Sequence, residues 1–476
     1  MIMFYLTGKV RQVWPGMALV AAFGGLFCGV CPVSAADAPA APATADAPAA
    51  PDSSSLLPQK PAWLSEASVG VKESFDDNVF MSGVNQSAVP AGTTTMKDRS
   101  SFITTVSPKA GFDFTRAANA NTNGVLELLS LTYTPDFVLY HGLSSESYDA
   151  HRANLAVKGK ADDFSFNLDS STWYVDGSTQ GPAYPGDLLN AWATINAYQR
   201  REQLEDRTKL TLQYDWNQWF IRPGATLAYY GMMSDIKNPS LASTPDGYQN
   251  YCTRYDVNGG FDLGYKFCPQ MDATLGYRYG AQDQQQYSFS PYSSPSDYQR
   301  LLAGLEGKPF SWLNMQLLGG PDFRSYESDS ATHISPLNNL HPMTYYGEAA
   351  LTATITPKDM LTFKYRQFQF VSCLGKVPYF DSSYDLSYRR KITNRLSFDA
   401  GARLLEADYT EANLAACQRN DYDYVLVTGL HYAFSANLAA DLGYQADLGR
   451  NSLDIPNSST RNFDSQLISL GFQFKL

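Results

Sequence analysis

The amino-acid sequence predicts an all-β fold: a transmembrane antiparallel β-barrel of about 18 strands, with short periplasmic turns and long extracellular loops. Three observations predict it: an export signal at the N-terminus, a period-two alternation of apolar and polar residues, and an alternation of short and long connections. An alternating strand has one apolar and one polar face, so it can separate lipid from a water-filled lumen. Sixteen or twenty strands also fit, because residues 192–216 count as one strand but could hold a turn in "RREQLED".

The N-terminus has the layout of a secretory signal peptide. Lys9 and Arg11 precede an apolar run from Met17 to Val30, and small residues follow up to Ala35. We therefore assign residues 1–35 as a signal peptide. A single transmembrane anchor is the alternative, but the run is short and interrupted by glycines.

The composition of the mature chain argues against nucleic acid as a partner. The formal charge of −11 becomes −13 once Lys9 and Arg11 leave with the signal peptide, and an acidic chain is a poor match for nucleic acid. Residues 36–62 are rich in Ala, Pro and Asp without periodicity, so they predict a disordered periplasmic linker. A segment that binds the cell wall or a partner protein is the alternative. Residues 63–476 show no further composition break and form one predicted barrel domain.

The predicted strands show the alternation most clearly at the C-terminus. Apolar residues occupy every second position of the last strand, at Ile468, Leu470, Phe472, Phe474 and Leu476. The same alternation recurs in residues 255–267, 380–389, 395–404 and 438–448. A β-sandwich would alternate too. Tyrosine and phenylalanine near the strand ends and glycine on the polar face favour the barrel.

The connections predict the orientation. Short polar links, such as residues 268–270, 390–394 and 435–437, alternate with long ones, such as residues 81–98, 178–190, 234–250, 329–340, 410–419 and 449–461. An even strand number places both ends of the mature chain in the periplasm. Tags at Ser330 or Ser452 should then be reachable from outside the cell.

Two stretches and the last strand carry a resemblance to a known family. They are "VGVKESFDDNVFMS" (Val69 to Ser82) and "RREQLEDRTKLTLQYDWNQWFIRPGATLAYY" (Arg200 to Tyr230), together with the aromatic C-terminal strand. The chain resembles outer-membrane β-barrel porins, including the barrels of exopolysaccharide-biosynthesis operons. The resemblance implies barrel architecture and a role in polysaccharide export. The terminal Phe of many such barrels is replaced by Leu476.

Catalytic and metal chemistry are not indicated, and no cofactor is predicted. The five histidines show no HxxxH or HExxH spacing, and the four cysteines left after cleavage form no CxxC pair. Asp76-Asp77-Asn78 could begin a calcium loop, but no second half of such a loop follows, so we favour a structural cap on the first strand.

Charged residues on the polar faces of the later strands are the candidate functional residues. They should face the lumen because a charge facing lipid costs several kcal/mol. Either they pair into ladders that hydrate the inner face, or they form a constriction that filters solutes by charge. Both signs occur, so no ion preference follows. The candidates are Lys364, Arg366, Asp381, Asp385, Arg389, Arg395, Asp399, Arg403, Asp441 and Asp447.

The cysteines test the predicted strand map. Cys373 and Cys417 fall in two consecutive outer loops, on the oxidising side, so we expect them to form a disulfide. Cys252 and Cys268 flank one strand and are too far apart to be linked. Four free thiols are the alternative.

The sequence thus predicts a Gram-negative outer-membrane barrel, not an enzyme, in contact with lipid and lipopolysaccharide. Its predicted function is porin-like passage of a hydrophilic solute, with exported polysaccharide as one candidate. The alternative is a non-conducting barrel that serves as a surface scaffold or assembly partner. The oligomeric state is not predicted.

Overall fold

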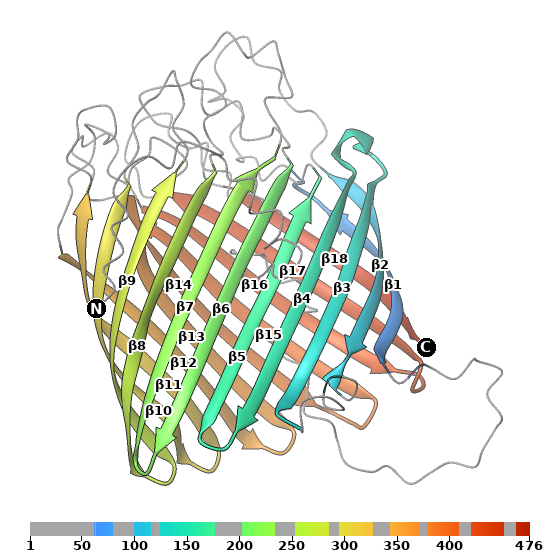
Figure 1. Cartoon of the computed structure of the whole chain (residues 1–476). Coiled ribbons are helices and arrows are strands. Elements are labelled where there is room, and N and C mark those ends of the chain that lie inside the picture. The colour runs from blue at the N-terminus through green and yellow to red at the C-terminus, as the bar shows by residue number, and fades with distance from the viewer. Residues whose placement is uncertain are drawn as a thin grey trace, which may run out of the picture.

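In the computed structural model the chain forms one closed antiparallel sheet of 18 strands, which confirms the predicted fold class and strand number (Figure 1). The structure describes residues 61, 63–79, 100–115, 118, 124–176, 202–233, 253–284, 295–326, 343–371, 378–408, 420–451 and 463–476. The strands are β1 (Leu64–Asp76), β2 (Ser101–Asp113), β3 (Leu126–Tyr140), β4 (Tyr148–Ala161), β5 (Phe164–Val175), β6 (Gln203–Trp216), β7 (Trp219–Met232), β8 (Arg254–Cys268), β9 (Met271–Gln284), β10 (Ser296–Phe310), β11 (Leu313–Tyr326), β12 (Met343–Thr356), β13 (Asp359–Val371), β14 (Pro378–Lys391), β15 (Leu396–Asp408), β16 (Asn420–Ala433), β17 (Leu438–Asn451) and β18 (Phe463–Lys475).

Each strand pairs with the next along the chain, and β1 pairs with β18 to close the barrel. Several predicted boundaries differ from the structure. The first strand begins at Leu64 rather than near Ala67, and the strand expected over residues 192–216 is β6, which begins at Gln203. The signal peptide and nearly all of the linker lie outside the described residues. Among the residues that are described, no helix has the length and apolar character needed to cross a membrane.

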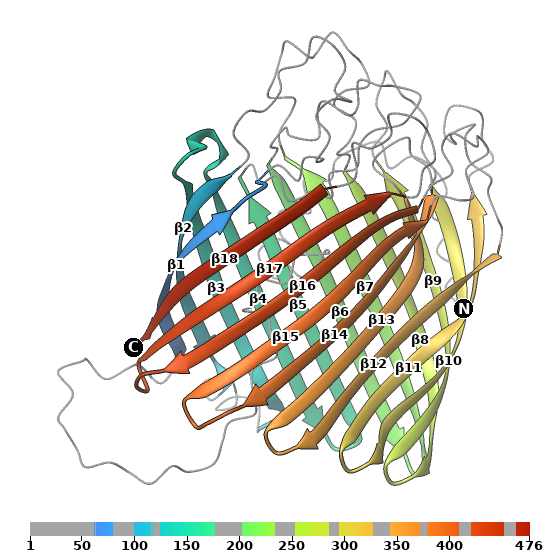
Figure 2. The same ribbon diagram turned by 180° about the vertical axis from the view of Figure 1, so that it is seen from behind.

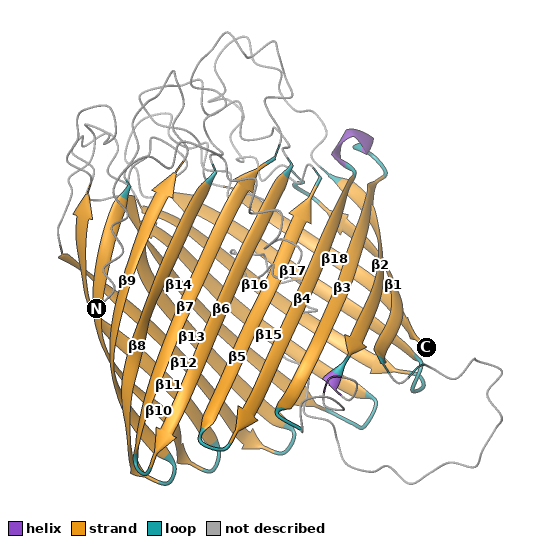
Figure 3. Ribbon diagram, in the orientation of Figure 1, coloured by secondary structure: helices purple, strands orange, loops and turns teal. Residues whose placement is uncertain are grey.

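Short turns gather at one end of the barrel, which we call the short-turn rim (Figures 2 and 3). Two of them place Asp162 and Asn217 at φ of 50° and 58°, a region that Asp and Asn tolerate better than most residues. β1 begins and β18 ends at this rim, where the Leu476 N–H donates to the Ala67 carbonyl at 2.9 Å. Both ends of the barrel therefore lie at the short-turn rim. Its placement in the periplasm, and the exposure of Ser330 and Ser452, remain predictions.

The outer face is apolar, as the alternation predicts. Ile468, Leu470, Phe472 and Phe474 of β18 are 43–54% exposed, and the register sets Val71 of β1 beside Phe472. Paired aromatic rings flank the short turns, among them Trp219 with Tyr265, Phe310 with Trp312, and Tyr432 with Phe434. An apolar belt bordered by aromatic rings on a closed barrel is a lipid-facing surface, and it locates the chain in the Gram-negative outer membrane.

Inward-facing glycines of β8 to β11 leave no room for a side chain beside the backbone of the neighbouring strand. A Cβ on Gly260 would lie 1.9 Å from the Tyr277 carbonyl oxygen, and one on Gly320 would lie 1.9 Å from that of Leu301. Only glycine permits so close a backbone approach. Large side chains also cover glycines, and a Cβ on Gly280 would lie 2.4 Å from the Tyr298 ring. This part of the barrel can therefore hold bulky side chains flat against its inner face.

Candidate functional site: the inner face of the barrel

Most predicted lumen residues lie on β13 to β17, at positions that alternate with the exposed apolar residues. Arg389 of β14 donates from Nε to Asp399 Oδ1 of β15 at 2.6 Å. Arg403 of β15 donates from Nε to Asp385 Oδ1 of β14 at 2.7 Å. Each pair joins neighbouring strands in direct register. These four candidate residues thus form two ion pairs between β14 and β15.

These ion pairs remain in contact with water. The side chains of Arg389 and Asp399 are 24% and 39% exposed. His431 of β16 and Asp441 of β17 approach to 2.5 Å between Nδ1 and Oδ1, and their side chains are 41% and 53% exposed. We call the inner face of β14 to β17 the open sector. It is a hydrated surface that carries charge inside the barrel.

The remaining candidates lie in different surroundings. Lys364 is exposed and lies opposite Asp385 in the β13–β14 register. Asp381 and Arg366 interact electrostatically with each other, and Asp381 also interacts with Arg254 of β8. Asp381 of β14 is thus within electrostatic range of Arg254 on β8, a strand with which β14 does not pair.

Two candidate residues, Asp447 and Arg395, lie outside the ion pairs of the open sector. Asp447 is buried and hydrogen-bonds to Asp423 of β16. Arg395 lies in the exposed turn between β14 and β15, one residue before β15 begins, so it is not part of the β-strand surface. Whether Arg395 meets solute at the short-turn rim stays a prediction.

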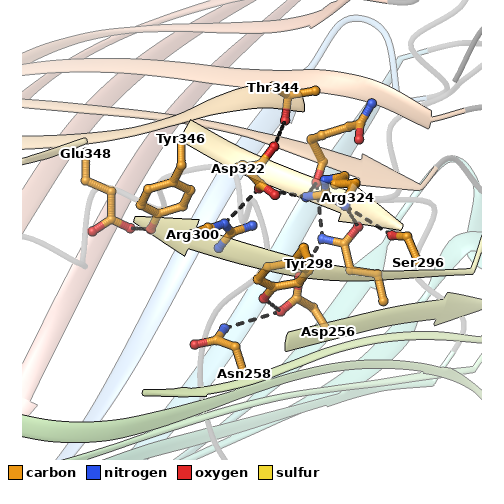
Figure 4. Close-up of polar contacts among 12 residues, drawn as sticks. Asp256, Asn258, Ser296, Tyr298, Arg300, Asp322, Arg324, Thr344, Tyr346 and Glu348 are labelled. Carbon is orange, nitrogen blue, oxygen red and sulfur yellow. Dashed lines mark hydrogen bonds and ion pairs between the residues drawn. The ribbon is translucent and has the colours of Figure 1, made fainter. Parts of the chain in front are cut away.

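A second group of charged residues, which the sequence did not single out, lies on β8 to β13 (Figure 4). Asp322 of β11 accepts from Arg300 Nε of β10 at 2.8 Å and from Arg324 of its own strand at 3.1 Å. The side chains of Arg300, Arg324 and Asp322 are 7%, 1% and 0% exposed, respectively. Burial of two guanidinium groups is compatible with folding because their charge is shared with a carboxylate and with further acceptors.

The same group connects strands that do not pair in the sheet. Arg324 donates to the Gln369 carbonyl of β13 at 3.0 Å and to Gln282 Oε1 of β9 at 2.8 Å. Gln282 in turn donates to the Gln369 carbonyl at 3.1 Å. β9 and β13 are separated by three strands in the sheet order, so these contacts cross the interior. They fill the space between β9, β11 and β13 with buried side chains.

Aromatic rings complete the group. The Arg300 guanidinium lies 4.0 Å from the Tyr298 ring centroid and 4.3 Å from that of Tyr346, and Tyr298 donates to Asp256 Oδ1 at 2.7 Å. Figure 4 shows Arg300 between the two tyrosines. We call this inner face of β8 to β13 the closed sector. Its members are Asp256, Gln282, Tyr298, Arg300, Asp322, Arg324, Tyr346 and Gln369.

Toward the short-turn rim, a further contact joins β7 to β10, which are separated by β8 and β9 in the sheet. Arg222 of β7 donates to both carboxylate oxygens of Glu306 of β10. Phe220 beside it is fully buried, and its ring lies over Gly264, where a Cβ would be 1.9 Å away. The filled part of the lumen thus continues along β7 to β10.

Asp76-Asp77-Asn78 forms a cap, as preferred from the sequence. Asp77 Oδ1 accepts from the Gln466 N–H at 2.7 Å, and Asn78 Nδ2 donates to the Asp464 carbonyl at 2.8 Å. Asp76 Oδ1 accepts from the Asn78 N–H at 2.8 Å. These bonds fasten the end of β1 to β18, and we call them the seam cap. Within the described part of the chain, no three His, Cys, Asp or Glu side chains are grouped to hold a metal ion.

Of the four cysteines in the mature chain, the structure describes Cys268. Cys268 lies at the end of β8, a single strand that begins at Arg254, as the strand map expected, and it forms no disulfide with another described residue. Cys252, Cys373 and Cys417 lie outside the described residues, so the predicted Cys373–Cys417 bridge remains a prediction. Non-reducing peptide mapping tests it, and a Cys252–Cys268 linkage would contradict the strand map.

No protein-family model and no curated protein matches the chain. Among solved structures, Pseudomonas aeruginosa OccK2 (OpdF) in complex with glucuronate is similar at 11% identity, with 86% of this chain and 98% of that chain covered and a TM-score of 0.39. The siderophore receptor PirA from Acinetobacter baumannii is similar at 7% identity, with 87% and 81% covered and a TM-score of 0.39. The FrpB iron transporter from Neisseria meningitidis is similar at 10% identity, with 86% and 81% covered and a TM-score of 0.42. At these values the likeness carries no argument about function.

Proposed function

We propose that the chain is a passive outer-membrane channel for hydrophilic solutes, which pass along the open sector without covalent catalysis. The observation that carries the proposal is the hydrated ladder of ion pairs on β14 to β17, whose side chains reach 53% exposure at Asp441. A lumen filled throughout by side chains would bury such groups, as happens in the closed sector.

Planar-bilayer recording of the purified protein tests the proposal. Stepwise conductance supports a channel, and silence over many insertions favours the alternative of a surface scaffold. The closed sector is the observation that favours this second candidate, because Asp322 and its partners show that part of the lumen is already filled.

A matched pair of substitutions sharpens the test. Gly429 of β16 faces the lumen, and a Cβ there would meet only the Leu442 carbonyl at 3.7 Å, so Gly429→Trp should project into the path. Thr428 is its exposed neighbour on the lipid-facing side of the strand. We expect Gly429→Trp to reduce the single-channel conductance and Thr428→Trp to leave it unchanged. Equal conductance in all three proteins would argue against passage along the open sector.

We extend the proposal to exported polysaccharide as the solute, which is supported only by the resemblance of residues 69–82 and 200–230 to exopolysaccharide-operon barrels. Oligosaccharides of increasing length, added on one side of the bilayer, should interrupt the current for times that grow with chain length. Brief interruptions independent of length would leave the channel in place and remove polysaccharide as its solute.

A further inference from the structure

The barrel wall divides between β12 and β13 at the end opposite the short-turn rim. β12 remains paired with β11 as far as its first residue, Met343, and β13 remains paired with β14 as far as its last residue, Val371. The register between β12 and β13, however, stops at Gly347–Gln367. The first four residues of β12 and the last four of β13 are therefore not aligned with each other, although the two lengths match. We call residues 368–371 of β13 and 378–381 of β14, which pair with them, the inner flap.

The inner flap bends into the lumen. β9 and β13 are four strand spacings apart in the sheet, which amounts to about 19 Å along the wall. Cα atoms of these two strands nevertheless come within 8 Å of one another. If the β12–β13 register continued, Gln369 would lie opposite Tyr345, which is 62% exposed on the outer face. Gln369 is instead 2% exposed, so this end of β13 has left the wall.

Three hydrogen bonds hold the inner flap, and all of them end on Gln369. Its backbone carbonyl accepts from Gln282 of β9 at 3.1 Å and from Arg324 of β11 at 3.0 Å. Its Oε1 accepts from the Tyr326 hydroxyl of β11 at 2.7 Å. We call these three bonds the latch. Every donor in the latch is a side chain, so the flap is held without any backbone pairing to β9 or β11.

The latch can open without leaving a charged group unpaired. Arg324 keeps its bond to Asp322, and Gln282 keeps its bond to Asp256. The docked arrangement also has a cost. Arg300 Nη2, Arg324 Nε and Asp322 Oδ1 are out of contact with water and have no hydrogen-bond partner among the described residues. Polar atoms buried in this way are destabilising, and water entering behind an undocked flap would satisfy them.

We propose that the inner flap is a gate with two positions. In the docked position the latch holds it against β9 and β11, and it narrows the lumen at the end opposite the short-turn rim. In the other position the flap pairs with the first four residues of β12, which completes the wall and widens the path. Latch bonds are then exchanged for backbone bonds and for bonds to water, so the two positions differ little in free energy. The inference rests on the proposed passage of solutes, since the gate acts on that path.

Single-channel recording of the full-length protein tests the latch. The wild type should switch between a smaller conductance level, with the flap docked, and a larger one. Tyr326→Phe removes one latch bond and keeps the ring, so the ratio of time at the larger level to time at the smaller level should rise about fivefold. Tyr326→Phe/Gln282→Leu removes two latch bonds and should raise the ratio about thirtyfold. The matched control is Tyr365→Phe, because this hydroxyl of β13 bonds to Gln367 on its own strand. It should keep the wild-type ratio.

A removable tether then tests whether the flap itself moves. Gln282→Cys/Gln369→Cys, in a protein whose native cysteines are replaced by serine, places one thiol on β9 and one on the flap. This protein lacks two of the three latch bonds, so the larger level should be frequent. Cross-linking with a short bifunctional methanethiosulfonate should abolish that level, and a reductant should restore it. Gln369→Cys alone, treated in the same way, has no thiol on β9 and should keep switching.

The possible results separate the gate from the channel. A single conductance level in every protein overturns the gate and leaves the passage of solutes standing. A larger level that survives cross-linking overturns its assignment to the inner flap, and an equal rise in Tyr365→Phe overturns the role of the latch. A silent wild type beside conducting latch variants supports a gate that is closed at rest. Silence of all the proteins overturns the passage and the gate together.

Discussion

The closed and open sectors are built from the same residue types on the same alternating strands, yet they differ in contact with water. Asp322 and Arg324 in the closed sector have side chains that are 0% and 1% exposed, whereas Asp399 and Asp441 in the open sector are 39% and 53% exposed. Closed-sector residues contact strands that are not neighbours, while the open-sector pairs join adjacent strands. The difference teaches that alternation decides which way a side chain points, and that contacts with strands beyond the neighbouring one decide whether it is buried.

The comparison predicts a large difference in stability between the two sectors. Arg324→Met leaves Asp322 buried with one fewer donor, and removing one partner of a buried ion pair costs about 3–5 kcal/mol. Arg389→Met in the open sector should cost about 0–1 kcal/mol, because both partners are hydrated. Urea unfolding in detergent micelles measures both free energies of unfolding. Equal losses would remove the distinction between the sectors.

The glycines of the filled region give the second prediction. Gly264→Ala places a methyl group against the buried Phe220 ring, and overpacking of this kind costs about 1–3 kcal/mol. Gly429→Ala in the open sector meets no such obstacle and should be nearly neutral. Combining Gly264→Ala with Phe220→Leu should recover part of the loss in a double-mutant cycle. If the two losses of stability simply add, the contact between the methyl group that Gly264→Ala introduces and the Phe220 ring does not contribute to the loss.

The seam cap belongs to neither sector and provides an intermediate reference. Asn78→Ala removes the bond from Nδ2 to the Asp464 carbonyl, which should lower the free energy of unfolding by about 1 kcal/mol. Addition of calcium should not protect the native protein, since the Asp76 and Asp77 side chains already bond to Asn78 and Gln466. Calcium-dependent stabilisation that Asn78→Ala abolished would restore the calcium interpretation.

The smallest effect is expected at the most hydrated pair. Asp441→Asn keeps a hydrogen-bonding side chain opposite His431, and exposed pairs contribute about 0–1 kcal/mol. The unfolding midpoint should therefore stay close to that of the wild type. A loss as large as that of Arg324→Met would mean that the open sector is packed as tightly as the closed one.

Much of the barrel could be predicted from the sequence because strand alternation is a local property. It located the lipid-facing residues of β18 and the inward pairs Arg389–Asp399 and Arg403–Asp385. Arg300, Asp322 and Arg324 have the same alternation, and Asp322 lies opposite Arg300 in the β10–β11 hairpin, so a register argument could have paired them. Their contact with Gln369 of β13 could not be predicted, because it depends on how the closed sheet curves.

The seam between β1 and β18 has a consequence for biogenesis. Asp77 and Gln466, which it joins, are 389 positions apart in the chain. Forming a contact between residues so far apart in the sequence costs the conformational entropy of closing a very long loop. We therefore expect this contact to form late in folding. Until Phe463–Lys475 arrives, the sheet has two unpaired edges, each able to add a strand from another chain. Pairing of β18 with β1 thus ends the period in which the sheet is vulnerable to aggregation, and a chain truncated before Phe463 would keep two unpaired edges.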